Sequence, residues 1–211
     1  MGSTFENHQE FLKDIQSGKY KDLMVDLESM GVGNSPALTQ ISAVAFDINT
    51  GEIGNTFNYI IDLKSSMDAG LTITAGTIKF WMTNQHVTDE ARQTVMSATS
   101  DHGQDSTRTL NDALIKLNKF ISYNKIKYVH GNGAASDNVW LRSAFEATGI
   151  PAGFTFRDDF CFRTIKTLAY RKGWEDNVVR EGVYHDGLDD AKHQVKVLRS
   201  CLDYLEIGDI K

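Results

Sequence analysis

The apolar positions in the first third of this chain fall into three short runs. They lie within residues 21–29, 38–47 and 56–62, and stretches with turn-forming residues separate them. Runs of this length and composition predict β-strands. Because the connections are short, the three strands are expected to pair as an antiparallel meander at the start of a sheet.

Further along the chain, apolar residues recur with the period of an α-helix. Two more strands are expected, at 126–130 and within 154–162. Helices are predicted over 74–85, from Thr88 onward, and over 107–124, 137–148, 164–171 and 187–205. This order predicts an α/β fold: a mixed five-stranded sheet, an antiparallel meander followed by parallel strands, flanked by helices.

The same pattern divides the chain. Residues 1–20 are polar and predict an N-terminal extension with at most a short helix that ends near Gly18. Residues 21–207 are expected to form a single domain, and residues 208–211 a tail. A chain of 211 residues is long enough for one domain with a full hydrophobic core.

Charge and composition narrow the classes of function. The formal net charge of −6 argues against broad electrostatic capture of nucleic acid, although it does not exclude an enzyme that acts on a nucleic-acid end. The longest apolar runs are too short to cross a bilayer, and no charged-then-apolar leader opens the chain. We expect a cytoplasmic protein with no membrane partner and with Cys161 and Cys201 reduced. Its oligomeric state is left open.

Asp26 and Glu28 interrupt the apolar strand within residues 21–29. Residues two apart point to the same face of a strand, so the two carboxylates are expected side by side. Unpaired, they would repel each other and be costly to bury, a penalty that a hard cation such as Mg²⁺ or Mn²⁺ removes. A chain of this size contains roughly one such Asp-x-Glu triplet by chance, so its meaning depends on later residues.

Two later stretches add acids and a histidine. Asp137 opens a helix directly after a strand and a glycine-containing loop, where it either caps the helix or faces a site at that edge of the sheet. His185 lies just before the last helix, and Asp190 lies in the first turns of that helix. Asp186 and Asp189 are interpreted as solvated neighbours of a functional Asp190.

The series Asp26-x-Glu28, Asp137 and His185-x-x-x-x-Asp190 resembles the three exonuclease motifs of the DEDDh 3′-5′ exonucleases, which are ribonuclease H-like proteins. The resemblance covers most of the chain, from residue 21 to about residue 205. Its local segments are similar to the branch that contains the phage exonuclease A proteins and the nuclease part of exodeoxyribonuclease VIII. Those segments are residues 26–31, 40–47, 81–85 and 131–133.

This resemblance implies a metal-dependent 3′-5′ exonuclease that hydrolyses phosphodiester bonds and releases nucleoside 5′-monophosphates. It implies two Mg²⁺ ions, for which Mn²⁺ can substitute. Asp26 would bridge the two ions, Glu28 and Asp190 would complete the first site, and Asp137 would serve the second. His185 would be the general base, because imidazole can accept a proton from the attacking water at neutral pH.

The chain departs from the family pattern at two supporting positions. Gly187 stands where the family usually has alanine, and Ser136 stands where phenylalanine is frequent. Both positions help to hold a ligand or the substrate, so the departures bear on affinity more than on chemistry.

Contacts with the substrate are predicted at several further residues. The resemblance implies that backbone groups of Leu27 and Ser29 contact the terminal nucleotide. Arg163 belongs to a basic cluster, residues 163–172, that either holds phosphates or forms a solvated helix face. Asn132 and Asn138 flank the middle acid and either orient a phosphate or close the turn.

Trp81 has two interpretations. It could stack on a base, but at helical spacing with Ile78 it is more often a core residue.

The 3′ end of single-stranded nucleic acid is the expected partner, with DNA favoured over RNA. RNA remains an alternative for the same site, because no motif encodes the contacts that would read a 2′-hydroxyl. A nucleic-acid-binding module without turnover is an alternative from another class. Such a module would be expected to lack a carboxylate or the histidine, and this chain has all five residues.

Overall fold

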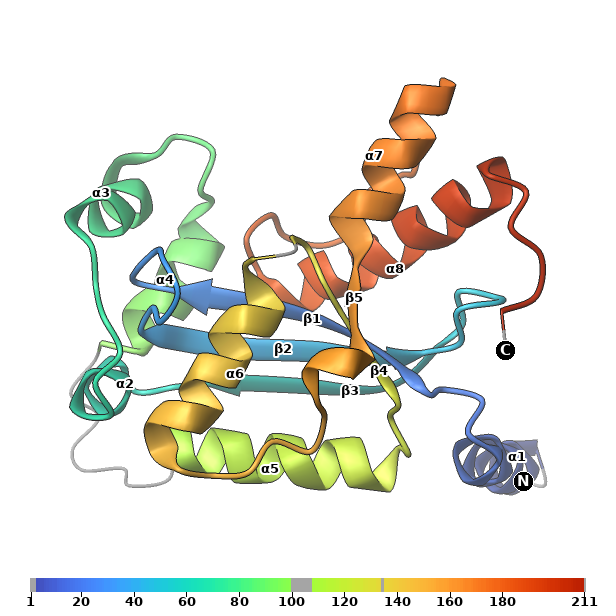
Figure 1. Cartoon of the computed structure of the whole chain (residues 1–211), viewed down its shortest axis with the longest axis horizontal. Coiled ribbons are helices and arrows are strands. Elements are labelled where there is room, and N and C mark those ends of the chain that lie inside the picture. Colours follow the sequence, from blue (N-terminus) through green and yellow to red (C-terminus); the bar gives the residue numbers. More distant parts are fainter. Residues whose placement is uncertain (1–2, 100–107, 134, 211) are drawn as a thin grey trace.

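The fold is built on a five-stranded sheet in the order β3-β2-β1-β4-β5 (Figure 1). The computed structural model describes residues 3–99, 108–133 and 135–210. The strands are β1 (Asp22–Ser29), β2 (Leu38–Phe46), β3 (Ile53–Ile60), β4 (Tyr128–Gly131) and β5 (Asp159–Cys161). Strands β1 to β3 pair antiparallel, whereas β4 and β5 add in parallel on the other side of β1. The predicted mixed sheet, with its antiparallel meander, is confirmed.

Helices cover both faces of the sheet. They are α1 (Ser3–Ser17), α2 (Leu63–Asp68), α3 (Ala75–Thr83), α4 (Asp89–Ser97), α5 (Leu110–Tyr123), α6 (Asp137–Thr148), α7 (Phe162–Lys172) and α8 (Gly187–Tyr204). Helices α5 and α6 lie on one face and α7 and α8 on the other, with α3 and α4 at one end of the sheet and α1 at the opposite end (Figure 1). Within the described chain, no helix has the length and apolar composition of a membrane span.

Alternation along β1 divides the core between the two faces. Leu23, Val25 and Leu27 pack into the cluster that contains α5 and α6, and Met24 packs into the cluster that contains α7 and α8. Asp26 and Glu28 continue the series of Met24, because side chains two apart share a face. The pattern of β1 therefore directs both carboxylates toward α8.

The bounds predicted for the third strand, 56–62, differ from those of β3. The third strand was expected to reach residue 62, but Asp62 instead caps α2 by accepting a hydrogen bond from the Ser65 N–H at 2.9 Å. The fifth strand lies within the predicted range of 154–162. It is three residues long, because Thr155 caps a 3₁₀ turn, η2 (Phe156–Asp158), directly before it. The prediction of Thr88 as an N-cap is confirmed, since its side chain accepts a hydrogen bond from the Ala91 N–H at 3.1 Å.

The predicted helix over 107–124 begins at Leu110, with Thr109 as its N-cap. Residue 107 lies outside the described residues. The predicted N-terminal helix is α1, whose Phe11 and Ile15 pack with Tyr20 beside the sheet. The division of the chain into extension, domain and tail stays a prediction.

Candidate active site

Three carboxylates from two elements meet at the carboxyl end of β1. Asp26 and Glu28 come from β1 and Asp190 from the first turns of α8, and one carboxylate oxygen of each lies within 4.8 Å of the others. Asp186 caps α8 by accepting hydrogen bonds from the backbone N–H groups of residues 188 and 189, both at 3.1 Å. This cap fixes where α8 begins and so directs Asp190 toward β1.

The electrostatics of this cluster are unfavourable without a counter-charge. Burial raises the pKa of the Asp26 carboxyl well above its usual range, and the charges of Asp137 and Asp190 raise this pKa further. Burial also raises the pKa of Glu28, with the charge of Asp26 as the next cause. Oxygen atoms in such an arrangement fit a hard divalent cation, which would neutralise the repulsion. The donor set thus agrees with the Mg²⁺ or Mn²⁺ expected from the sequence.

Two neighbours that were not predicted from the sequence hold these acids. The Gln194 Nε2 donates a hydrogen bond to Asp26 Oδ1 at 2.6 Å, and the Arg180 guanidinium forms an ion pair with Asp190. Gln194 lies one helical turn after Asp190, so the i, i+4 spacing on α8 could have revealed it. Arg180 lies in the irregular segment before α8, where no sequence period indicates its direction.

Asp137 stands beside the three carboxylates and has its own anchors. Its Oδ1 accepts a hydrogen bond from the Leu27 N–H at 3.3 Å, and its Oδ2 accepts one from the Asn132 N–H at 2.8 Å. The N-cap position of α6 belongs to Ser136, so Asp137 does not cap that helix. Burial raises the pKa of the Asp137 carboxyl, although these backbone N–H groups oppose the shift. Asp137 therefore fastens the loop after β4 to β1.

His185 lies at the end of the segment that leads into α8. Its backbone has a φ of 63°, in the left-handed region. Its ring meets Phe80 and Trp81 edge to face, with ring centroids 5.5 and 6.2 Å apart. The imidazole is half-buried and lines the cleft that also contains Glu28, so the histidine and the acids share one site.

Asp189, interpreted as a solvated neighbour of Asp190, is partly exposed and does not belong to the three-carboxylate cluster, but it also makes a structural contact. Its Oδ2 accepts a hydrogen bond from the Val183 N–H at 3.0 Å, and a Cβ at Gly182 would lie 2.3 Å from that oxygen. Asp189 therefore fastens the segment that carries His185 to α8.

We expect Asp189→Ala to lower kcat several-fold and to destabilise the fold by about 1 kcal/mol, because the Val183 N–H loses its partner. Lys192→Ala is the matched control, since it removes the 3.5 Å ion pair with Asp189 but leaves the Val183 hydrogen bond. Initial rates and thermal melting of both variants would measure the effect. A kcat for Asp189→Ala equal to that of Lys192→Ala would contradict this role.

A cleft of about 570 Å³ opens beside the carboxylates, within the size range of ligand pockets. Both residues predicted to meet the terminal nucleotide, Leu27 and Ser29, lie in its wall. The other lining residues include aromatic and polar side chains: Glu28, Gly31, Val32, Thr74, Gly76, Thr77, Phe80, Trp81, Trp140, Arg163 and His185. Trp81 is buried and donates to the Ser29 carbonyl at 2.9 Å, which supports the core interpretation, although it also lines the cleft.

The two asparagines beside Asp137 differ in their surroundings. Asn132 accepts a hydrogen bond from the Arg163 Nε at 3.4 Å, so these two predicted substrate residues lie next to each other. Asn138 is buried, and its Nδ2 donates to the Val129 carbonyl and to Asp159 Oδ1, both at 2.9 Å. Since both bonds point toward β4 and β5, Asn138 is a packing residue of this loop, and the substrate role predicted for it has no support in its position.

The two departures from the family pattern have local causes. A Cβ at Gly187 would lie 2.7 Å from the Ser42 Oγ, so the serine on β2 occupies the space that an alanine would need. The Ser136 hydroxyl lies 3.3 Å from Asp137 Oδ2 and can donate a hydrogen bond to it, which a phenylalanine could not do.

Comparison with known proteins gives a family match and similar folds. Residues 21–202 match the family model described as the 3′-5′ exoribonuclease Rv2179c-like domain. The fold is similar to the nuclease domain of 3′hExo, a DEDDh family member bound to rAMP, with a TM-score of 0.57, 13% identity, and coverage of 87% of this chain and 92% of that one. It is also similar to a full-length 3′-exonuclease, with a TM-score of 0.56, 13% identity, and coverage of 87% and 61%.

No curated protein sequence matches the chain. The expected ribonuclease H-like α/β fold is confirmed by these structures. The narrower resemblance to the phage exonuclease A branch stays a prediction.

Proposed function

Since this chain belongs to the family of Rv2179c-like 3′-5′ exoribonuclease domains, we propose that it removes nucleoside 5′-monophosphates from the 3′ end of single-stranded RNA. The 3′-5′ exonuclease activity itself follows from the family. RNA as the substrate and two metal ions as cofactors are the proposed details.

The family match is the observation that carries the choice of RNA, because its description names an exoribonuclease. The similar nuclease domain of 3′hExo was solved with rAMP, a ribonucleotide, which agrees with this choice. DNA was the substrate favoured from the sequence alone, and that preference has no support in these comparisons. DNA therefore remains the alternative that the experiment below tests.

The chemistry needs a water oxygen to attack the phosphorus while the bond to the 3′-oxygen of the preceding nucleotide breaks. When bound, two divalent ions would activate that water and neutralise the charge that develops on the phosphate. The carboxylates of Asp26, Glu28 and Asp190 would hold these ions, with Asp137 as a further ligand. His185 would accept the proton of the attacking water. The leaving 3′-oxygen gains a proton and becomes the new 3′-hydroxyl.

The side chains that line the cleft are suited to bind the terminal nucleotide of the substrate. Phe80, Trp81 and Trp140 contribute aromatic surface to its wall, and aromatic surface of this kind stacks on any base. Arg163 adds a positive charge at the same wall, close to where a phosphate would meet the carboxylates. A cleft with these properties would bind a terminal nucleotide without strong base preference.

Digestion of end-labelled oligonucleotides tests the proposal. RNA and DNA of one sequence, labelled at either end, would be incubated with Mg²⁺, with Mn²⁺ and with EDTA. We expect 5′-labelled RNA to give a ladder that shortens from the 3′ end, to be digested faster than DNA, and to stay intact in EDTA. Faster digestion of DNA would restore the preference inferred from sequence. Metal binding without cleavage of either polymer would indicate a binding module.

A further inference from the structure

Helix α7 forms one wall of a second groove next to the cleft. The helix follows β5 at the edge of the sheet and projects away from it (Figure 1). Phe162 and Ala169 are buried in the core on one side of α7. The groove, about 350 Å³, is lined by Cys161, Arg163, Thr164, Thr167, Leu168 and Arg171.

The groove and the nucleotide cleft share one lining side chain. Arg163 lines both cavities, and its bond with Asn132 holds it at their junction. Arg163, Thr167 and Arg171 are spaced four residues apart and so share one face of α7. The two arginines are separated by about 12 Å along the helix axis. A basic path therefore leads away from the carboxylates along α7.

Among the residues that the structure describes, no acid neutralises the charges of this path. Arg163 and Arg171 form no ion pair with an acid of the described residues, whereas Lys166, on another side of α7, pairs with Asp176 at 2.8 Å. Helix stability can account for Arg171 in the last turn but not for Arg163 in the first turn, where the helix dipole disfavours a positive charge. In a chain with a net charge of −6, an unpaired arginine at this position favours a role for Arg163 in binding an anion.

We propose that this groove binds backbone phosphates of the single strand upstream of the nucleotide being removed. The inference rests on the proposed function, since it assigns the cleft to the terminal nucleotide and the groove to the nucleotides before it. Arginine suits the task because its guanidinium pairs with phosphate oxygens through two hydrogen bonds. Contacts of this kind set affinity and position without reading sequence.

The test measures how binding depends on salt. Each phosphate contact to a single strand contributes a slope of about −0.7 to log K against log[salt]. A labelled RNA 10-mer would be titrated against the inactive Asp26→Asn protein at several salt concentrations, by fluorescence anisotropy. We expect Arg171→Ala in that protein to bind several-fold more weakly and to reduce the slope by about 0.7, and Arg171→Lys to keep most of the slope.

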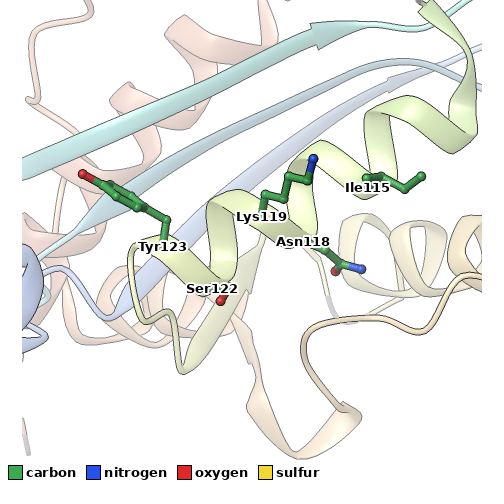
Figure 2. A pocket seen from close by; sticks show the side chains of 5 residues that line it. All are labelled: Ile115, Asn118, Lys119, Ser122 and Tyr123. Atoms are coloured by element: carbon green, nitrogen blue, oxygen red, sulfur yellow. The ribbon is translucent and has the colours of Figure 1, made fainter.

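A matched control comes from the opposite face of the sheet. Figure 2 shows Lys119 on α5, where it lines another surface pocket with Ile115, Asn118, Ser122 and Tyr123. Lys119→Ala removes the same single charge away from the path and should leave the slope unchanged. An unchanged slope for Arg171→Ala, or an equal loss for Lys119→Ala, would overturn the proposal.

Hydrolysis separates this proposal from the proposed function. In the active protein, Arg171→Ala should raise KM for the 10-mer much more than KM for a dinucleotide, which is too short to reach along α7. Equal increases in KM for the two substrates would contradict the proposed phosphate-binding role of the groove. Absence of hydrolysis in the parent protein would instead overturn the proposed function. The salt dependence of RNA binding would still test whether the groove binds phosphates.

Discussion

Asp26→Asn is expected to abolish hydrolysis and, at the same time, to make the metal-free protein more stable. The variant removes one negative charge from a cluster in which burial and the neighbouring carboxylates raise the pKa of Asp26. Asparagine has the same shape, and its side-chain oxygen can still accept the hydrogen bond from Gln194. The loss of activity would therefore report the missing charge and not a disturbed strand.

The gain in stability should depend on pH in a defined direction. The carboxyls of Asp26 and Glu28 have raised pKa values in the folded protein, so the folded state disfavours their charged forms. Their contribution to stability is fully present below about pH 4, near the ordinary pKa of an acid, and is lost as the pH rises through the folded values. At neutral pH, Asp26→Asn should then melt above the parent, by about 2–4 °C for each 1 kcal/mol of repulsion that is removed in a domain of this size.

Thermal melting in EDTA between pH 4 and 8 measures this difference, which should shrink toward pH 4. Addition of Mg²⁺ or Mn²⁺ should stabilise the parent and leave the variant nearly unchanged. Asp209→Asn, at an exposed position near the C-terminus, removes the same charge as a control. If Asp26→Asn still digests RNA at the parental rate, the assignment of Asp26 to catalysis is refuted. If Asp26→Asn and the parent melt at the same temperature in EDTA, the expected repulsion between the carboxylates is refuted.

His185→Asn is expected to lower kcat by about 10²- to 10⁴-fold while metal binding stays nearly intact. The histidine would act on the proton of the attacking water and not as a ligand, so its loss should affect turnover alone. Asparagine is the better replacement than alanine, because the φ of 63° at this position is one that asparagine tolerates. His185→Ala would add backbone strain, so the effect of losing the imidazole could not be separated from the effect of the strain.

Single-turnover rates and calorimetric titration with Mn²⁺ would separate catalysis from metal binding. His86→Asn, in the exposed connection between α3 and α4, is the control for loss of a histidine. Free imidazole should restore part of the activity of His185→Ala, since the lost ring leaves space against Phe80 and Trp81. A kcat within a factor of two of the parent for His185→Asn would remove His185 from the mechanism.

Local signals explain why the order of the elements could be predicted. Apolar periods of two and of 3.6 residues, together with caps such as Thr88, indicate strands and helices without reference to the rest of the chain. The end of β3 was misplaced because Asp62 forms a helix cap that competes with the strand. Helix α2 was missed, since its six residues are too few to establish a helical period.

The sequence by itself determined the fold class and indicated the acids and the histidine that the structure brings together, because their order and spacing are properties of the chain. Only the tertiary structure decided which groups accompany them. Arg180 and Gln194 reach the acids because α8 packs on β1, and Asn138 turns away because its amide bonds to β4 and β5. Such contacts depend on the packing of distant elements, which no local period of apolar residues encodes.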